Sequence, residues 1–167
     1  MLNVAFKEWA VICQALAEGR QSLILRKGGI AEENGMFRPD HDRFWLYPTY
    51  LHQQAAGIKP ESAELLERVE REKPPAGIVR IQHYLEVSNV RFIDSLNDAL
   101  ALAPSHIWSE ETVRMRFHYR KPGLYALNVK VVSLATAYEI VETPEYEGCK
   151  TWVMLNPPLA TEGWRIV

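Results

Sequence analysis

Alternating hydrophobic and polar residues predict several β-strands. A period of two places successive side chains on opposite faces of a sheet, and Leu124–Leu134 follows this period most clearly. Ile78–Val87 shows the same alternation, and Arg91–Ile93 either extends this strand or follows it. Shorter runs of aliphatic and aromatic residues predict further strands. These are Leu23–Leu25, Arg43–Tyr47 and Thr151–Leu155, and we expect Pro157-Pro158 to close the structured part.

Helical spacing of apolar residues and capping residues predict helices between these strands. The strongest is Glu61–Glu72, in which Leu65 and Val69 share an apolar face and charged residues cover the rest. Pro74-Pro75 stops this helix. Three shorter helices are indicated by N-cap residues. One starts at Thr49 and stops at Gly57, one is capped by Asp94 or Ser95 and ends at Ala103, and one is capped by Ser109.

The N-terminal segment Phe6–Arg26 allows two interpretations. Trp9, Val11 and Cys13 alternate with polar or smaller residues, which favours a β-hairpin. A helix over Asn3–Ala17 is the rival, because apolar residues in it also recur with helical spacing. Periodicity alone does not decide such short apolar runs, and the hairpin is our preferred prediction.

The mixture of elements predicts an α+β fold. Strands and helices do not alternate strictly, so we expect a mixed or mainly antiparallel sheet with three to four short helices. A length of 167 residues fits one domain over residues 1–167. Lys73–Gly77 is the best candidate for an internal seam, and it is too short to link independent domains.

Charge and composition exclude some classes of protein. The formal net charge is −2, so the chain as a whole is no polycation, and binding of nucleic acid would need a local basic patch. The N-terminus shows no secretion signal and no run approaches the roughly 18 apolar residues of a membrane span. We therefore expect a cytoplasmic protein without membrane contact.

Two cysteines, Cys13 and Cys149, limit the chemistry further. Two thiols make no disulfide scaffold, and with scattered histidines they supply no zinc ligand set at the usual spacing. A phosphate-binding loop is also missing, because Lys27-Gly28-Gly29 has the glycines and the lysine in reversed order. The dinucleotide fingerprint and the nucleophile elbow of serine hydrolases are absent as well. We expect neither metal nor cofactor, and whether the protein is an enzyme stays open.

Four groups of residues are distinctive when taken together. They are Glu8-Trp9-Ala10, Leu25–Ile30, Phe44–Thr49 with His52, and Tyr146-x-Gly148-Cys149-x-x-Trp152. Together they resemble an uncharacterised bacterial family, the domain of unknown function 1802, over most of the chain. The resemblance implies bacterial origin and a cytoplasmic location, and it implies no particular activity.

The leading functional hypothesis is a binding module for nucleic acid or another phosphorylated ligand. Arg114–Lys121 is rich in basic and aromatic residues, and it gives a concentrated positive surface both as a strand and as a helix continuing from Ser109. Guanidinium groups match the oxygens of phosphate, and aromatic rings can stack on bases. The ordinary alternative is a solvated face paired with Glu110 and Glu111. The candidate binding residues are Arg114, Arg116, Arg120 and Lys121, with Arg26 and Lys27 as additional contacts.

Two further hypotheses remain. A hydrolase of a nucleotide or nucleic acid would use His41, Asp42 and His52, because imidazole titrates near neutral pH and can transfer protons or bind a divalent metal. The ordinary alternative is a polar loop entering an aromatic strand. A third hypothesis is a regulatory or structural protein partner that docks on exposed aromatic side chains from Trp45 to Tyr50. The sequence leaves the oligomeric state open.

Overall fold

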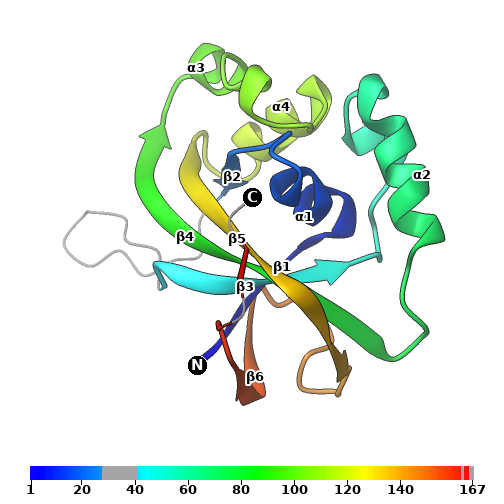
Figure 1. The fold of residues 1–167 in the computed structure, drawn as a ribbon. Helices are drawn as coiled ribbons and strands as arrows, with labels where there is room; N and C mark the ends of the chain where they lie inside the picture. Colours follow the sequence, from blue (N-terminus) through cyan, green and yellow to red (C-terminus); the bar gives the residue numbers. More distant parts are fainter. Residues whose placement is uncertain (28–40, 163, 166–167) are drawn as a thin grey trace.

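One mixed β-sheet organises the computed structural model, which describes residues 1–27, 41–162 and the backbone of 164–165 (Figure 1). Its strands follow the order β2-β5-β4-β3-β1-β6, and β7 pairs with β5. The strands are β1 (Leu2–Trp9), β2 (Leu23–Arg26), β3 (Arg43–Thr49), β4 (Ile78–Ile93), β5 (Leu124–Val141), β6 (Trp152–Leu159) and β7 (Trp164–Arg165). Strands β1 and β3 are parallel, and the other pairs are antiparallel. The predicted α+β class with a mixed sheet is confirmed.

Among the described residues, four α-helices lie together on one side of the sheet, at the top of the view in Figure 1. They are α1 (Ala10–Ala17), α2 (Ala63–Arg71), α3 (Leu96–Leu100) and α4 (Glu110–His118), with 3₁₀ turns at Ala55–Gly57, Pro60–Ser62 and Ala103–Ser105. The predicted Ser109 cap is confirmed, because its hydroxyl accepts a hydrogen bond from the Thr112 amide. Each helix within the described ranges is too short or too polar to span a lipid bilayer.

The predicted N-terminal hairpin is wrong. The chain instead forms strand β1, helix α1 and strand β2, and the rival helix is right only for its second half, Ala10–Ala17. Every residue of α1 except Gln14 is buried. A helix that is buried on nearly all sides has no polar face, so its sequence lacks the 3.6-residue period that marks a surface helix. The alternation of Trp9, Val11 and Cys13 therefore has no structural meaning.

Other boundaries also differ from the expectation. Thr49 caps no helix, because its hydroxyl donates to the backbone oxygen of Glu8 at 3.2 Å, and His52 takes a left-handed backbone with φ of 70°. Pro157 and Pro158 lie within β6. Prolines fit there because β6 is at the edge of the sheet order, where no second neighbour needs their missing amides. The glycine and proline residues after β2 also predict a loop over Ile30–Asp42, and this segment falls largely outside the described residues.

Both faces of β3 are buried, and this corrects the prediction of an exposed aromatic surface. Phe44 and Leu46 belong to the main core between sheet and helices, together with residues of α1 and β2. Trp45 and Tyr47 belong to a second apolar cluster formed with β4, β5 and β6. Trp45 has an exposed fraction of 0% and Tyr47 of 1%. They are core residues because the strand is covered on both sides, so they offer no docking surface to a partner.

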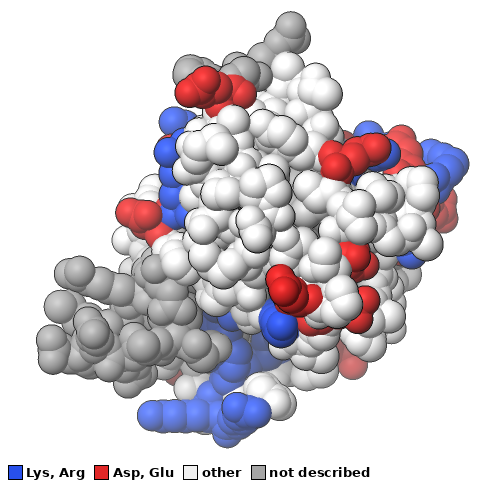
Figure 2. Space-filling view, turned by 90° about the horizontal axis from the view of Figure 1, so that it is seen from below, with Lys and Arg blue, Asp and Glu red and all other residues white. Residues whose placement is uncertain are grey.

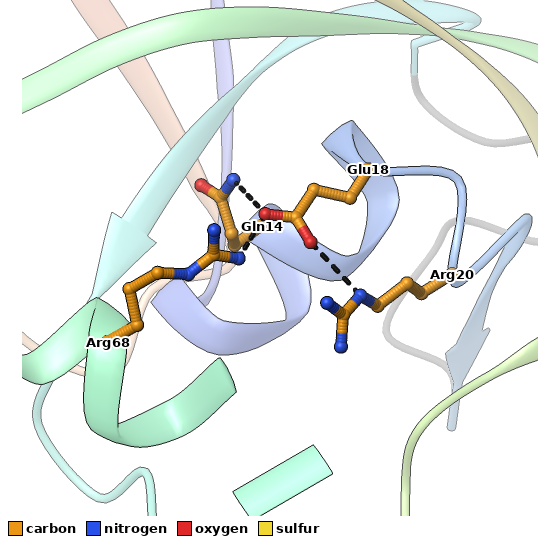
Figure 3. Close-up of polar contacts among 4 residues, drawn as sticks. All are labelled: Gln14, Glu18, Arg20 and Arg68. Carbon is orange, nitrogen blue, oxygen red and sulfur yellow. Dashed lines mark hydrogen bonds and ion pairs between the residues drawn. The ribbon is translucent and has the colours of Figure 1, made fainter. Parts of the chain in front are cut away.

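A carboxylate at the end of α1 joins this helix to α2 (Figure 3). Glu18 accepts a hydrogen bond from Gln14 at 2.9 Å and forms ion pairs with Arg68 of α2 and with Arg20, the latter at 3.0 Å. Partial burial raises the pKa of Glu18, but the hydrogen bonds from Gln14 and Arg68 and the positive charges outweigh it. The pKa therefore lies below its ordinary value of 4.5.

We expect Glu18→Gln to lower the free energy of unfolding by about 0.5–1 kcal/mol at pH 7, because the ion pairs are partly exposed. The folded state lowers the pKa, so it binds fewer protons than the unfolded state. This stabilisation is therefore present above the unfolded-state pKa and is lost as pH falls through the folded-state pKa. Urea unfolding of wild type and variant should differ at pH 7, and the difference should shrink as pH falls below 4.5 and through the folded-state pKa. Glu67→Gln on the exposed side of α2 is the control, and a difference that persists unchanged at pH 3 would contradict the assignment.

Candidate functional site

The parallel strands β1 and β3 end side by side at one edge of the sheet. Their register pairs Glu8 with Pro48 and Trp9 with Thr49. Helix α1 begins at the next residue, Ala10, so the chain turns away from the sheet at this point. The side chains that end the two strands are thereby left facing a hollow instead of another strand.

Basic side chains from three elements and from the residue after β2 surround this hollow. It has a volume of about 320 Å³, and we call it the basic hollow. The strand ends contribute Lys7, Glu8, Trp9, Leu25, Arg26 and Thr49, Lys27 follows β2, and Arg116 comes from α4. Three of the predicted binding residues, Arg26, Lys27 and Arg116, are thus brought together from segments far apart in the sequence.

Arg26 and Arg116 are held by aromatic rings. The guanidinium carbon of Arg26 lies 4.9 Å from the ring centre of Phe6, and that of Arg116 lies 4.8 Å from the ring of Trp108. Arg26 also donates a hydrogen bond to the Thr151 hydroxyl at 3.1 Å. Within the described part of the chain, neither guanidinium has a carboxylate within 4 Å. Both charges therefore stay available to a ligand.

The charges in the basic hollow act on one another. Burial lowers the pKa of Arg26; the carboxylate of Glu8 raises it, and the neighbouring positive charge of Arg116 lowers it further. Two like charges close together in a partly buried place repel each other. Such an arrangement is relieved when an anion binds between them.

Glu8 is the acidic residue of the basic hollow. Only 9% of it is exposed, and its Oε1 accepts a hydrogen bond from the Trp9 amide at 2.8 Å. Burial raises the pKa of Glu8, while Arg116, the Trp9 amide and Arg26 act in the opposite direction. The carboxylate thus partly offsets the two arginines, and the basic hollow keeps a positive balance.

A buried histidine stands beside the ring that supports Arg116. His106 and Trp108 have ring centres 5.4 Å apart. Burial lowers the pKa of His106 to about 4, and the charges of Lys59 and Arg116 add to the effect. His106 is therefore neutral at pH 7 and adds no positive charge behind Arg116. Among the described residues, neither ring nitrogen of His106 nor the indole N–H of Trp108 has a hydrogen-bond partner.

Lys27 lines the basic hollow, but its ammonium group mainly bonds to the backbone of the fold. Its Nζ donates to the backbone oxygens of Phe117 at 2.5 Å and Gly123 at 2.9 Å, and also to that of Lys121. These carbonyl groups lie at and just after the C-terminal end of α4, where a cation interacts favourably with the helix dipole. Lys27 therefore ties β2 to α4 and keeps Arg116 near Arg26.

A second, larger hollow adjoins the first. Its volume is about 680 Å³, and it shares Lys7, Trp9 and Thr49 with the basic hollow. The rest of its lining is mainly apolar, with polar groups at a few places. That lining consists of Pro48, Tyr50, Leu51, His52, Lys73, Pro74, Pro75, Ala76, Gly77, Ile78, Val79, Glu142, Glu147, Gly148, Cys149 and Lys150.

Trp9 lines both hollows, and its ring packs on a glycine. A Cβ built on Gly57 would lie 2.6 Å from the Cη2 and Cζ3 atoms of Trp9. Any side chain at position 57 would thus displace the six-membered end of the indole. The amide of Ser109 donates to the oxygen of Gly57 at 3.0 Å, so the N-terminal end of α4 holds this glycine in place.

The remaining predicted binding residues lie outside both hollows. Arg114 is on the exposed side of α4 and pairs with Glu110 at 2.7 Å, and the guanidinium of Arg120 lies over the ring of Tyr119. Lys121 is exposed in the turn after α4. Residues 114–118 belong to helix α4, so the strand interpretation of this part of Arg114–Lys121 is wrong and the helix interpretation is right. Phe117 is buried in the core.

The three candidate hydrolase residues are placed in different surroundings. His52 lines the larger hollow, whereas His41 packs its ring against Trp152 at 5.1 Å and Asp42 is exposed. His41 and Asp42 line neither hollow. In the ranges that the structure describes, no three His, Cys, Asp or Glu side chains gather as a metal site.

Charge is distributed unevenly over the surface. In the view from below, uncharged residues cover most of the face, and Lys and Arg side chains gather toward its lower edge (Figure 2). A net charge of −2 is therefore compatible with local positive regions.

Sequence reasoning missed Lys7, Glu8, Trp9 and Thr49 as site residues. A signal existed for Glu8, because a carboxylate stands directly before the apolar run Trp9–Cys13. Ionised groups are rarely buried without a purpose, so a charge inside an apolar segment marks a candidate site.

Comparison with known proteins identifies the family. The family model described as a domain of unknown function (DUF1802) matches residues 5–167. The chain belongs to the DUF1802 family. No curated protein sequence matches this DUF1802 chain.

The fold of this DUF1802 chain is similar to that of ASCH proteins. The crystal structure of ASCH from Zymomonas mobilis has a TM-score of 0.55 at 12% identity, covering 92% of this chain and 87% of that one. A mutant of the ASCH protein from the same organism has a TM-score of 0.55 at 11% identity, covering 92% and 88%. At such low identity, the likeness concerns the fold alone.

The segments that resemble the DUF1802 family come together at the two hollows. Glu8 and Trp9 come from the first segment, Arg26 and Lys27 from the second, and Thr49 with His52 from the third. The fourth segment contributes Gly148 and Cys149 to the larger hollow. Residues separated by more than a hundred positions thus line one continuous surface.

We expect Lys27→Met to lower the free energy of unfolding by about 1–2 kcal/mol, because three carbonyl oxygens lose a charged donor. The methionine keeps the length and the apolar stem of lysine. Denaturant unfolding monitored by circular dichroism measures the change. Lys121→Met is the matched control and should stay within about 0.5 kcal/mol of wild type, since this side chain is exposed. Equal stability of both variants would show that Lys27 does not tie β2 to α4.

Proposed function

We propose that this DUF1802 protein is a binding module for nucleic acid or another phosphorylated ligand, and that Arg26 and Arg116 hold the phosphate. The observation that carries the proposal is the pair of guanidinium groups facing one hollow. In the described residues, both groups are supported by aromatic rings and neither is neutralised by a carboxylate within 4 Å.

Guanidinium chemistry favours phosphate as the ligand group. Arginine presents its N–H donors in a planar fork that matches two phosphate oxygens, and it is more weakly hydrated than lysine. Lys7 adds a further positive charge to the basic hollow, and the carboxylate of Glu8 offsets one of the positive charges. The resulting positive balance suits an anion and disfavours a cation.

The outer basic residues extend the proposed surface. Arg120 and Lys121 are exposed in the turn after α4, the helix that carries Arg116. Phosphates along a polymer could contact these exposed side chains while one phosphate enters the basic hollow. This supports a nucleic acid over a small phosphorylated molecule.

A hydrolase function has less support. His41 and Asp42 do not line the hollow that His52 lines, so the three residues share no evident site. The function of a protein-interaction module also loses its original support, because Trp45 and Tyr47 are core residues. The binding module is therefore the function that the geometry favours.

We expect Arg26→Met and Arg116→Met each to weaken binding of labelled single-stranded DNA or RNA by about 10-fold or more at low salt, because a charge-assisted hydrogen bond contributes on the order of 1.5–3 kcal/mol. Fluorescence anisotropy titrations measure the change, and thermal unfolding verifies that each variant is folded. The salt dependence of binding should also become less steep, since fewer counterions are released.

Arg114→Met is the matched control, since it removes the same charge two residues from Arg116 on the exposed side of α4. We expect it to weaken binding less than threefold, as a peripheral charge contributes little. Equal losses in all three variants would favour a diffuse basic surface over the basic hollow. If the wild type does not bind single strands, duplexes or phosphate at low salt, the proposed function is wrong.

We expect Glu8→Gln to strengthen binding of single-stranded nucleic acid several-fold at pH 7, because it removes a negative charge beside the bound phosphate and keeps the acceptor for the Trp9 amide. In the wild type, burial raises the pKa of Glu8, so protonation begins above the ordinary value of 4.5. Wild-type affinity should therefore rise as pH falls toward that region, whereas the affinity of the variant should change little.

Titrations between pH 5 and 8 test this prediction, and phosphodiester ligands keep their charge throughout that range. Glu110→Gln removes an exposed carboxylate of α4 and serves as the control. A wild-type pH profile that the Glu8→Gln variant reproduces would show that Glu8 does not influence the phosphate.

A further inference from the structure

The larger hollow has the composition of a site for a flat, partly apolar group. Pro48, Tyr50, Leu51 and Ile78 line it, together with other apolar residues from the segment before β4. Its volume of about 680 Å³ lies within the range typical of small-molecule sites, roughly 300–1,000 Å³. The basic hollow next to it is smaller and carries the arginines. One ligand could thus place an anionic group in one hollow and an uncharged group in the other.

Trp9 is the aromatic member of the three residues, Lys7, Trp9 and Thr49, that line both hollows. Its backbone lies at the junction of β1 and α1, and its indole ring packs closely on Gly57. A ring fixed in this way loses little freedom when a ligand stacks on it. Stacking of a base on an aromatic side chain contributes about 1–3 kcal/mol and does not depend strongly on the base.

Polar groups stand at a few places around the larger hollow. Lys7 donates to the oxygen of Gly148 at 3.1 Å, and the Tyr47 hydroxyl donates to Glu142 at 2.9 Å. Lys7, Glu142 and Gly148 all line the larger hollow. Fixed donors and acceptors beside an apolar wall suit the edge of a nucleobase, which carries both kinds of group.

We propose that the larger hollow binds the base of one unpaired nucleotide, stacked on Trp9, while the adjoining phosphate lies at Arg26 and Arg116. This inference rests on the proposed function and adds the class of ligand. A base in a duplex is stacked and paired on both sides, so it would have to leave the helix to enter the hollow. The site therefore selects single strands over duplexes, and nucleotides over sugar phosphates.

The test compares two ligands of the same length and charge. One is a short oligothymidylate, and the other is the same chain of deoxyribose phosphates without bases. Wild type, Trp9→Leu, Trp9→Phe and Arg116→Met are titrated with both, and each variant is first shown to be folded by circular dichroism. Removing the stacking ring should weaken binding of oligothymidylate by about 5- to 150-fold in Trp9→Leu, the range that the stacking energy implies.

The pattern across the variants separates the two proposals. Trp9→Leu should not change the affinity for the abasic chain, Trp9→Phe should keep most of the affinity for oligothymidylate, and Arg116→Met should weaken both ligands. Equal wild-type affinity for the two ligands, or no effect of Trp9→Leu, would overturn the base site and leave the phosphate site in place. Failure of the wild type to bind either ligand would overturn both.

If Trp9→Leu does not fold, Gly57→Ala tests the same stacking of the base on Trp9. The added methyl group would displace the indole ring without removing it. We expect weaker binding of oligothymidylate and unchanged binding of the abasic chain. Quenching of tryptophan fluorescence by oligothymidylate should be present in wild type and reduced in Trp9→Phe, whereas quenching that is equal in both would place the base elsewhere.

Discussion

The parallel pairing of β1 and β3 is the constraint on which the site depends. Parallel neighbours end at the same edge of a sheet, and the chain must leave that edge through a crossover. Here β1 continues directly into α1, whose residues are almost all buried between the sheet and the other helices. The edge beside Trp9 and Thr49 therefore stays open, and the side chains of β2 and α4 complete its walls.

Electrostatic compensation explains how several charges can stay at this edge. Aromatic rings of Phe6 and Trp108 support the guanidinium groups without neutralising them, and Glu8 offsets part of their charge from a buried position. His106 stays uncharged behind Trp108, because burial lowers its pKa to about 4. Desolvated charges disfavour folding unless they are balanced by opposite charges. The incompletely balanced arginines therefore lower the free energy of unfolding somewhat, and they leave a site open for an anion.

The sequence predicted elements well where one side of an element faces water. The strand beginning at Leu124, the helix within Glu61–Glu72 and the cap at Ser109 were found because period and capping are local signals. Helix α1 was missed because burial on nearly all sides removes the period. The aromatic residues of β3 were misjudged for the same reason, since a strand covered on both faces looks like any apolar run.

By itself the sequence determined the α+β class, the family and the residue types that can bind phosphate. Arg26, Lys27 and Arg116 could be named as basic candidates, but their different roles depend on neighbours distant in sequence, such as Phe117 and Gly123 for Lys27, which lie 90 and 96 positions away. Only the tertiary structure decided that Lys27 holds the end of α4, that Arg114 faces away and that Arg116 meets Arg26 beside Glu8. The physical reason is that charge type belongs to the residue, whereas burial and the distance between charges belong to the packing of distant segments.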